Sequence, residues 1–253
     1  IGTLAGVFVQ SVDLTRRSSV LRGADVAGAI FLGCKLRPTD ASHLSRAGAL
    51  VFPRLPDLPF DAYRPALYSP DELYHGLERG YSATTDATIF AWSQHHRRPA
   101  ARGPARAAAW PDRAISEALG QIVADVDPQQ IVGIMGGHAQ RRGTGPYRAS
   151  AHLAHDLAEA GVLVLSGGGP GAMEAANLGA SFTGTAHELD DAVDALASAA
   201  GWSDDLTAWA RSAQQVRAAY PCRRLSLGIP TWFYGHEPPN LFAAGIAKYF
   251  INA

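Results

Sequence analysis

The sequence is poor in the residues that hold a fold by covalent bonds or metals, and it has no strong excess of charge. Its two cysteines, Cys34 and Cys222, give neither a disulfide framework nor the spacing of a metal site, which suits a protein of the reducing cytoplasm. The formal net charge of −1 leaves no general basic field, so we expect no nucleic-acid partner.

Long apolar runs are also missing. No run reaches roughly 18 residues, the length that a membrane-spanning helix needs. The first residues lack the basic-then-apolar order of a secretory signal. We therefore expect a cytoplasmic protein without a membrane partner.

What the chain does have is enough apolar material for a core. Of its 253 residues 47% are hydrophobic, which supports one large domain or two smaller ones. We place the division near residue 110. Residues 1–110 then form an N-terminal region of uncertain fold and unknown role, and residues 111–253 form a second domain.

Strand and turn signals dominate the first 60 residues. A weak five-residue rhythm, in which Ala24, Ala29 and Cys34 recur, is compatible with a coil of a β-solenoid. Three units are few, however, and the pattern favours a pair of ordinary strands.

Helix signals follow in the rest of the N-terminal region. Residues 69–72, Ser-Pro-Asp-Glu, have the pattern of a capping box and predict a helix start. A second helix is expected over residues 86–95. The stretch 97–111 is rich in Arg, Pro and Ala, and we interpret it as a linker or surface excursion.

Residues 111–253 alternate between helical and strand patterns. The order strand, helix, strand, helix in residues 131–180 predicts a parallel sheet with right-handed crossovers, and so an α/β protein. The last predicted helix has no capping residue before Ala253, so we expect the domain to continue beyond it. The predicted elements are helix 112–125, strand 131–135, helix 147–160, strand 162–165, a helix from Pro170, helices 188–200 and 204–219, strand 225–230 and helix 241–253.

The most informative segment is VLVLSGGGPGAMEAANLGA, residues 162–180. A buried strand passes through the turn Ser166-Gly167-Gly168-Gly169 into a helix that Pro170 opens. Glycines without Cβ atoms let backbone N–H groups approach a ligand, and the helix N-terminus adds partial positive charge. The turn could merely pack a helix on a sheet. The coincidence of strand, triple glycine and helix start instead favours a site for phosphate or another anion.

A second loop, Gly136–Gly145, leaves the neighbouring predicted strand. Ligands of open α/β sheets bind at this carboxyl edge, where Gly136, Gly137 and His138 begin the loop. Arg141 and Arg142 either pair with a phosphate or are ordinary surface charges.

Carboxylate and amide side chains are expected near the same edge. Glu174 and Asn177 lie three residues apart on one helix face, and Glu174 either complements the helix dipole or hydrogen-bonds a ribose hydroxyl. Glu237 and Asn240 follow strand 225–230 and suit sugar hydroxyls or a base edge, although Asn240 is also a standard helix cap.

Other motifs are excluded by their spacing. The glycine turn lacks the G-x-G-x-x-G pattern and acidic residue of a dinucleotide site, and no Gly-Lys-Ser/Thr phosphate loop is present. Asn240 stands where a zinc HExxH motif starting at His236 needs its second His, so we expect no metal. Ser166 is not in G-x-S-x-G, so its hydroxyl is expected to cap the turn or contact a ligand.

These segments resemble the Lonely Guy family, also described as lysine-decarboxylase-like Rossmann proteins. SGGGPGAMEAANLGA is similar to the family's GGGxxGxM segment, here Gly167–Met173. LSLGIPTWFYGHEPPN is similar to a later strand and its acidic-x-x-Asn turn, here Glu237 and Asn240. The similarity covers about residues 130–253. It implies a Rossmann-like parallel sheet flanked by helices, usually in a homodimer.

The resemblance also implies a function. Family members hydrolyse the N-glycosidic bond of a nucleoside 5′-monophosphate to a free base and ribose 5-phosphate, and they need no cofactor. A carboxylate and an arginine stabilise the oxocarbenium-like ribose. Together with the residue patterns, the resemblance predicts a phosphate and nucleotide site that contains Gly136, Gly137, His138, Ser166, Gly167, Gly168, Gly169, Gly171, Met173, Glu174, Asn177, Glu237 and Asn240.

One departure from the family concerns catalysis. The second family signature, PGGxGTxxE, supplies the catalytic glutamate and is absent from these 253 residues. It would lie just beyond Ala253, after a helix that usually offers Arg-Lys where this chain has Ala247-Lys248. We therefore assign no catalytic residue, and a non-catalytic nucleotide-sensing module is the alternative function.

Overall fold

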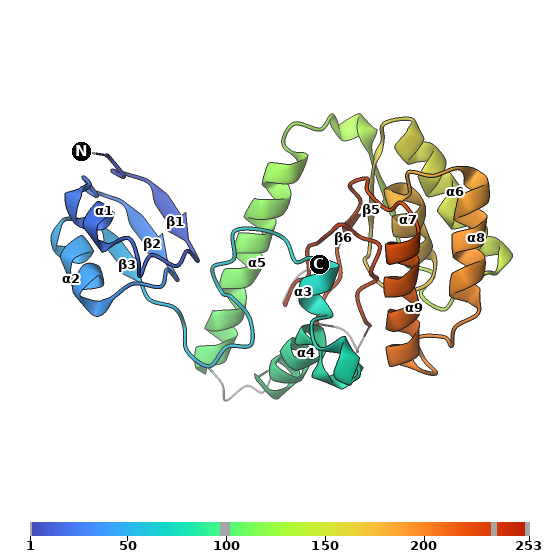
Figure 1. The fold of residues 1–253 in the computed structure, drawn as a ribbon, viewed down its shortest axis with the longest axis horizontal. Coiled ribbons are helices and arrows are strands. Elements are labelled where there is room, and N and C mark those ends of the chain that lie inside the picture. Colours follow the sequence, from blue (N-terminus) through green and yellow to red (C-terminus); the bar gives the residue numbers. More distant parts are fainter. Residues whose placement is uncertain (1, 97–101, 234–236, 251–253) are drawn as a thin grey trace.

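The computed structural model describes residues 2–96, 102–233 and 237–250, and it has an α/β fold with two parallel sheets. The predicted fold class is confirmed. Figure 1 shows the smaller sheet at the N-terminal end, the larger sheet near the C-terminal end, and the long helix α5 (Arg102–Val123) between them.

The N-terminal sheet is built from a repeated strand-helix unit. Three parallel strands pair in chain order, with Phe8, Ile30 and Leu50 in register. An Ala-Gly pair stands shortly before each strand, and the glycines of these pairs, at 6, 28 and 48, all have positive φ. The elements are β1 (Phe8–Gln10), α1 (Ser18–Gly23), β2 (Ile30–Leu32), α2 (Pro38–Arg46) and β3 (Leu50–Phe52).

This repeat differs from the expected pair of strands. The register spacing shows that the unit is 20 to 22 residues long, because Phe8 pairs with Ile30 and Ile30 pairs with Leu50. The five-residue rhythm reflects only one part of it, since Ala29 and Cys34 are buried while Ala24 is partly exposed. The helices between the strands bury their own small core around Leu21, Phe31 and Leu44.

The middle of the chain is helical. Ser69 caps α3 as predicted, because its hydroxyl accepts from the N–H of Glu72 at 3.1 Å. The Glu72 carboxylate pairs with Arg64 at 2.9 Å, so we find only half of the expected capping box. The elements are α3 (Pro70–Leu73), 3-10 turns at Leu77–Arg79 and Tyr81–Ala83, and α4 (Thr85–His96).

The linker predicted for residues 97–111 is wrong in the part that the structure describes. Helix α5 already begins at Arg102, and it continues through Pro111, while residues 97–101 lie outside the described residues. Alanine and arginine are strong helix formers, and the fully buried Ile115 anchors the helix. These contributions outweigh the interior proline.

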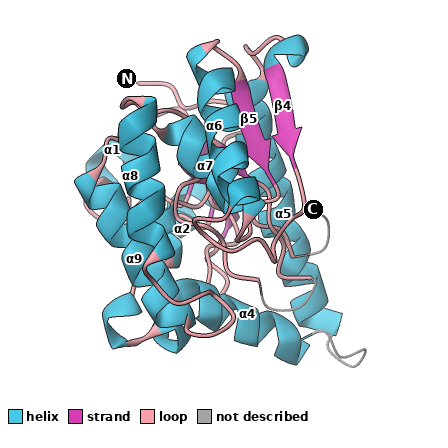
Figure 2. Ribbon diagram, turned by 90° about the vertical axis from the view of Figure 1, so that its right-hand side faces the viewer, coloured by secondary structure: helices cyan, strands magenta, loops and turns pink. Residues whose placement is uncertain are grey.

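The second sheet has the predicted strand-helix alternation. Its four strands are all parallel and lie in the order β4-β5-β6-β7. Helix α6 connects β4 to β5, three helices connect β5 to β6, and Figure 2 shows α6 and α7 beside β4 and β5. The elements are β4 (Ile131–Ile134), α6 (Gly145–Glu159), β5 (Leu163–Ser166), α7 (Ala172–Ser181), α8 (Ala186–Ala197), α9 (Leu206–Ala219), β6 (Leu227–Gly228) and β7 (Gly245–Ile246); a 3-10 turn at Pro128–Gln130 precedes β4.

The helix predicted for residues 241–253 is wrong over the residues described. Gly245–Ile246 forms strand β7, which pairs with β6 on one side. On its other side Ile246 exchanges two backbone hydrogen bonds with Tyr68, at 2.8 and 3.0 Å. An apolar run of this length does not reveal its conformation, and pairing on both sides decides it. Residues 251–253 lie outside the described part.

The largest hydrophobic core joins segments that are far apart in the sequence. It contains residues from Phe60–Ile89 and from Tyr147–Phe250, so it crosses residue 110. Within it Lys248 and Asp86 form a buried ion pair at 2.5 Å. No helix in residues 2–96, 102–233 or 237–250 is both long and apolar enough to cross a membrane.

Candidate functional site

Loops from three strands and one helix pair meet at the carboxyl edge of the second sheet. The loops after β4, β5 and β6 leave this edge because the strands are parallel. Helices α7, α8 and α9 follow one another between β5 and β6, so the α8–α9 loop returns to the same edge. There the indole N–H of Trp202 donates to the carbonyl of His138 at 3.2 Å.

Glycine is required at two positions of the turn after β5. Gly168 has a φ of 72°, and a Cβ there would lie 2.6 Å from Pro230 Cδ. Gly171 also has a φ of 72°, and a Cβ there would overlap the carbonyl of Gly137. Helix α7 begins at Ala172, so Pro170 lies in the turn and does not open the helix as predicted. The positive φ of Gly171 delays the helix start by two residues.

The backbone amides of this turn divide into two groups. Gly168 N–H donates to Ser166 Oγ at 2.9 Å, and Ala172 N–H donates to the Gly137 carbonyl at 3.1 Å. In the described part of the chain, no protein group accepts from the N–H groups of Gly169, Met173 and Glu174. These donors and the helix dipole can hold an anion.

A buried network of polar side chains braces the turn from behind. Ser166 Oγ donates to Asn177 Oδ1 at 2.6 Å, and Asn240 Nδ2 donates to the same oxygen at 2.8 Å. Asn240 also donates to the carbonyls of Gly168 and Gly169, at 2.7 and 3.2 Å. Ser166, Asn177 and Asn240 are fully buried, so their side chains position the glycine turn.

Glu174 and Arg142 form a buried ion pair in front of α7. Arg142 Nε and Nη2 donate to the two carboxylate oxygens at 2.9 and 2.5 Å. Arg142 Nη1 donates to the Trp209 carbonyl and to Ser212, and the guanidinium lies 4.8 Å from the Trp209 ring centre. Burial would lower the pKa of Arg142, but Glu174 more than offsets this and raises it. The pair fixes the loop after β4 against α7 and α9.

His138 and Glu237 are accessible charged or polar groups beside the turn. His138 Nδ1 lies 3.1 Å from Glu237 Oε1, and the two side chains are 55% and 41% exposed. Glu237 Oε2 lies 3.2 Å from the position that a Cβ of Gly169 would take. Glu237 therefore lies next to the turn, and its carboxylate is not part of a buried ion pair.

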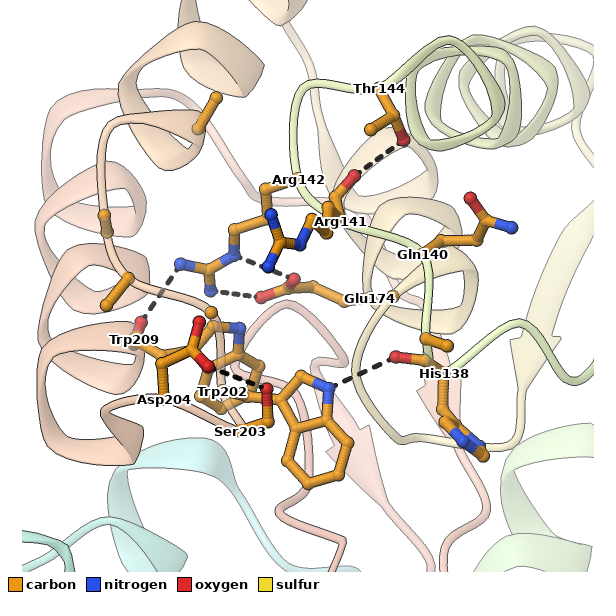
Figure 3. A pocket seen from close by; sticks show the side chains of 16 residues that line it. His138, Gln140, Arg141, Arg142, Thr144, Glu174, Trp202, Ser203, Asp204 and Trp209 are labelled. Atoms are coloured by element: carbon orange, nitrogen blue, oxygen red, sulfur yellow. Dashed lines mark hydrogen bonds and ion pairs between the residues drawn. The ribbon is translucent and has the colours of Figure 1, made fainter.

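A cavity of about 600 Å³ opens between the β4 loop and the α8–α9 loop (Figure 3). Of the predicted site residues, His138, Gly171 and Glu174 line it. The others lie outside its lining: Gly136, Gly137, Ser166, Gly167, Gly168, Gly169, Met173, Asn177, Glu237 and Asn240.

Sequence reasoning missed the far wall of this cavity, which includes Trp202, Ser203, Asp204 and Trp209. The stretch Gly-Trp-Ser-Asp-Asp at residues 201–205 does carry a turn signal between two amphipathic helices. The sequence does not show that the direction of α8 places this turn at the carboxyl edge of the second sheet.

The described residues contain no group of three or more His, Cys, Asp or Glu side chains that could hold a metal ion. No protein-family model matches the chain, and no curated protein matches it. The fold and the site geometry are therefore the basis for a functional proposal, together with the motif resemblance.

Proposed function

We propose that residues 111–253 bind a nucleoside 5′-monophosphate and belong to a phosphoribohydrolase of the Lonely Guy type. The observation that carries this proposal is the set of amide donors on Gly169, Met173 and Glu174, which lie beside the exposed Glu237 at the ligand edge of a parallel sheet. The segment Gly167–Met173 supports it, because it resembles the family's glycine signature.

The phosphate would occupy the start of α7. Backbone N–H groups and the helix dipole favour a dianion there, and they do so without any side-chain charge. His138 and the exposed Arg141 reach the same end of the β4 loop and add donors. The buried network behind the turn supports the backbone that carries these amides.

The sugar and the base would use the accessible groups on either side. The Glu237 carboxylate is a hydrogen-bond acceptor for ribose hydroxyls. The cavity in Figure 3 has room for a base, with Trp202 for stacking and the exposed Asp204 as an acceptor for base N–H groups. No cofactor enters this proposal.

The reaction is a hydrolysis. The bond between C1′ and the base nitrogen breaks and a water oxygen bonds to C1′; one proton of that water stays on the new C1′ hydroxyl, and the other is transferred to the base nitrogen. The positive charge that develops on the ribose ring calls for a carboxylate in van der Waals reach. We assign binding roles to the described residues and leave the catalytic carboxylate unassigned.

The proposal is tested with the full-length protein and a panel of purine and pyrimidine nucleoside monophosphates. Chromatography measures the free base, and calorimetry measures binding. We expect release of free base from at least one monophosphate. If none binds and none is cleaved, the proposal is wrong.

A nucleotide sensor is the second candidate, and one contact favours it. Tyr74, in the N-terminal region, donates from its hydroxyl to the Pro239 carbonyl at 2.5 Å, inside the turn that carries Glu237 and Asn240. Through this hydrogen bond, a change at the occupied site would be transmitted to the N-terminal region. Tight binding of a monophosphate without release of base is the result that selects the sensor.

The proposal includes an assembly and a compartment. We propose a homodimer in the cytoplasm, since the resemblance implies the first and the scarcity of cysteine suits the second. Light scattering of the full-length protein measures the assembly. A monomer at micromolar concentration would contradict this part alone.

A further inference from the structure

The first 60 residues carry a charge that the rest of the chain does not share. These residues contain seven Lys and Arg and four Asp, so their formal net charge is +3. The remaining residues carry fifteen cationic and nineteen anionic side chains, which gives −4. A basic unit joined to an acidic one indicates that the N-terminal sheet meets an anion.

The cations of this unit gather at one edge of its sheet. Because β1, β2 and β3 are parallel, the residues that follow each strand lie at the same edge. A bridge between Asp13 and Lys35 continues the register past the strands and brings the first two loops together. The exposed cations that follow the three strands are Arg16, Arg17, Lys35, Arg37 and Arg54.

A hollow of about 630 Å³ lies among these side chains. Asp13, Thr15, Arg16, Arg17 and Lys35 line it. The Asp13 carboxylate is already engaged, because it accepts from the N–H and the hydroxyl of Thr15 at 3.0 and 2.6 Å. These hydrogen bonds also lower the pKa of Asp13, so it stays ionised and bound to its neighbour.

The positive charges of the two arginines in the hollow are not neutralised by ion pairs. Within the described residues no ion pair involves Arg16 or Arg17, and Lys35 lies 3.5 Å from Asp13 with most of its side chain in solvent. The nearby Asp40 is buried and paired with Arg22, so it does not neutralise them. Two guanidinium groups and one ammonium therefore face the same open space.

We propose that Arg16, Arg17 and Lys35 form a binding site for a small anion with two or three linked phosphate groups. Neighbouring strands lie about 4.8 Å apart, so loops from adjacent strands bring their cations close enough to contact one chain of linked phosphates. Guanidinium forks bind phosphate oxygens in pairs. The site belongs to the N-terminal sheet and uses no residue of the nucleotide site, so it stands independently of the proposed function.

Titration calorimetry of the full-length protein with inorganic tripolyphosphate, in magnesium-free buffer, tests this site. The test variant is Arg16→Gln/Arg17→Gln/Lys35→Gln. The matched control is Arg79→Gln/Arg113→Gln/Arg223→Gln, which removes three exposed cations elsewhere. We expect the control to bind like the unmodified protein, and the test variant to bind more than about tenfold more weakly. The single variant Arg16→Gln gives a smaller loss, which keeps the test valid if the triple variant folds poorly.

Three results would overturn the proposal: no binding by the unmodified protein, an equal loss in both triple variants, or displacement of tripolyphosphate by a saturating nucleoside monophosphate. The last result would place the anion at the glycine turn. A nucleoside triphosphate titrated in parallel identifies the source of the phosphates. Equal affinity assigns the site to the phosphate chain alone, and tighter binding assigns it to a nucleotide.

Discussion

Arg142 holds together several parts of the proposed nucleotide site. Its side chain is 6% exposed, and its guanidinium pairs with the fully buried Glu174 and also contacts α9 through Trp209 and Ser212. A buried pair of this kind need not add net stability, but removing one partner leaves the other charge stranded.

We predict that Arg142→Gln lowers the free energy of unfolding by about 3–5 kcal/mol, because Glu174 loses its partner inside the protein. Arg113→Gln is the matched control, since Arg113 pairs with Glu117 on the surface of α5. Its loss should stay within about 0.5 kcal/mol. Urea unfolding measures both, and equal losses would contradict the assignment of Arg142.

Glu237 gives a prediction about binding instead of stability. Glu237→Gln should weaken the binding of a nucleoside monophosphate by about tenfold, because a hydrogen bond to a charged acceptor is lost. The melting temperature should not move, since the side chain is 41% exposed. Glu78→Gln, whose side chain is 72% exposed and which does not line the cavity, is the control for affinity. Unchanged affinity in Glu237→Gln would remove Glu237 from the proposed site.

For single residues, the sequence predicted the glycine turn, but it did not predict which side chains around the turn pair with each other. Although the atoms that a Cβ would meet belong to Pro230 and Gly137, the positive φ that the turn needs at Gly168 and Gly171 follows from local rules. They do not decide whether Arg141 or Arg142 turns inward, since the two are adjacent and chemically alike. That choice depends on Glu174, which lies 32 residues further along the chain.

At the scale of the elements, helices α6 and α7 pack closely against each other. Gly179 of α7 lies against Ala151 of α6, and a Cβ at Gly179 would overlap the Ala151 carbonyl. The two helices cover the sheet from the same side (Figure 2), so their separation sets where the start of α7 lies.

We predict that Gly179→Ala lowers the free energy of unfolding by more than about 2 kcal/mol, because the helices must move apart. Gly120→Ala is the matched change in α5, where an added Cβ meets nothing within 4 Å. It should stabilise the protein by about 0.5–1 kcal/mol, the usual preference of a helix for alanine. Thermal unfolding compares the two. A Gly179→Ala protein as stable as the original would show that this contact is looser than described.

The elements were predicted best where the chain is amphipathic. Helices α6, α8 and α9 lie close to their expected positions because their apolar spacing has a clear period. Helix α4 and strands β4 and β5 also lie close to their expected positions, although their apolar residues follow no such period. The segment around β7 has no such period: Phe242, Ala243, Ile246 and Ala247 are all buried. Only the contacts of Ile246 with Tyr68 and of Gly245 with Leu227 make it a strand.

At the scale of the whole molecule, a buried charge pair joins the N-terminal region to the segment that follows β7 of the second sheet. Asp86 in α4 accepts from Lys248 at 2.5 Å, from the Trp232 indole at 3.0 Å and from the Tyr81 hydroxyl at 2.5 Å. Burial lowers the pKa of Lys248, and the Asp86 charge opposes that shift.

We predict that Lys248→Met costs about 3–5 kcal/mol of unfolding free energy, because the Asp86 carboxylate stays buried without a counter-charge. The chain's other lysine supplies the control: Lys35→Met removes an exposed partner of Asp13 and should cost less than about 1 kcal/mol. The double variant Asp86→Asn/Lys248→Met should recover part of the loss. Urea unfolding tests all three, and no recovery in the double variant would contradict the pairing.

The strand-helix repeat at the N-terminal end has a consequence for how the protein can vary. Each 20- to 22-residue unit begins with a glycine of positive φ, and its strand pairs with the strand of the unit beside it. Whole units can therefore be duplicated or deleted while the register of the remaining strands is preserved. Duplication would add another loop to the same row, so the number of cationic loops can grow or shrink in steps without any change in the second sheet.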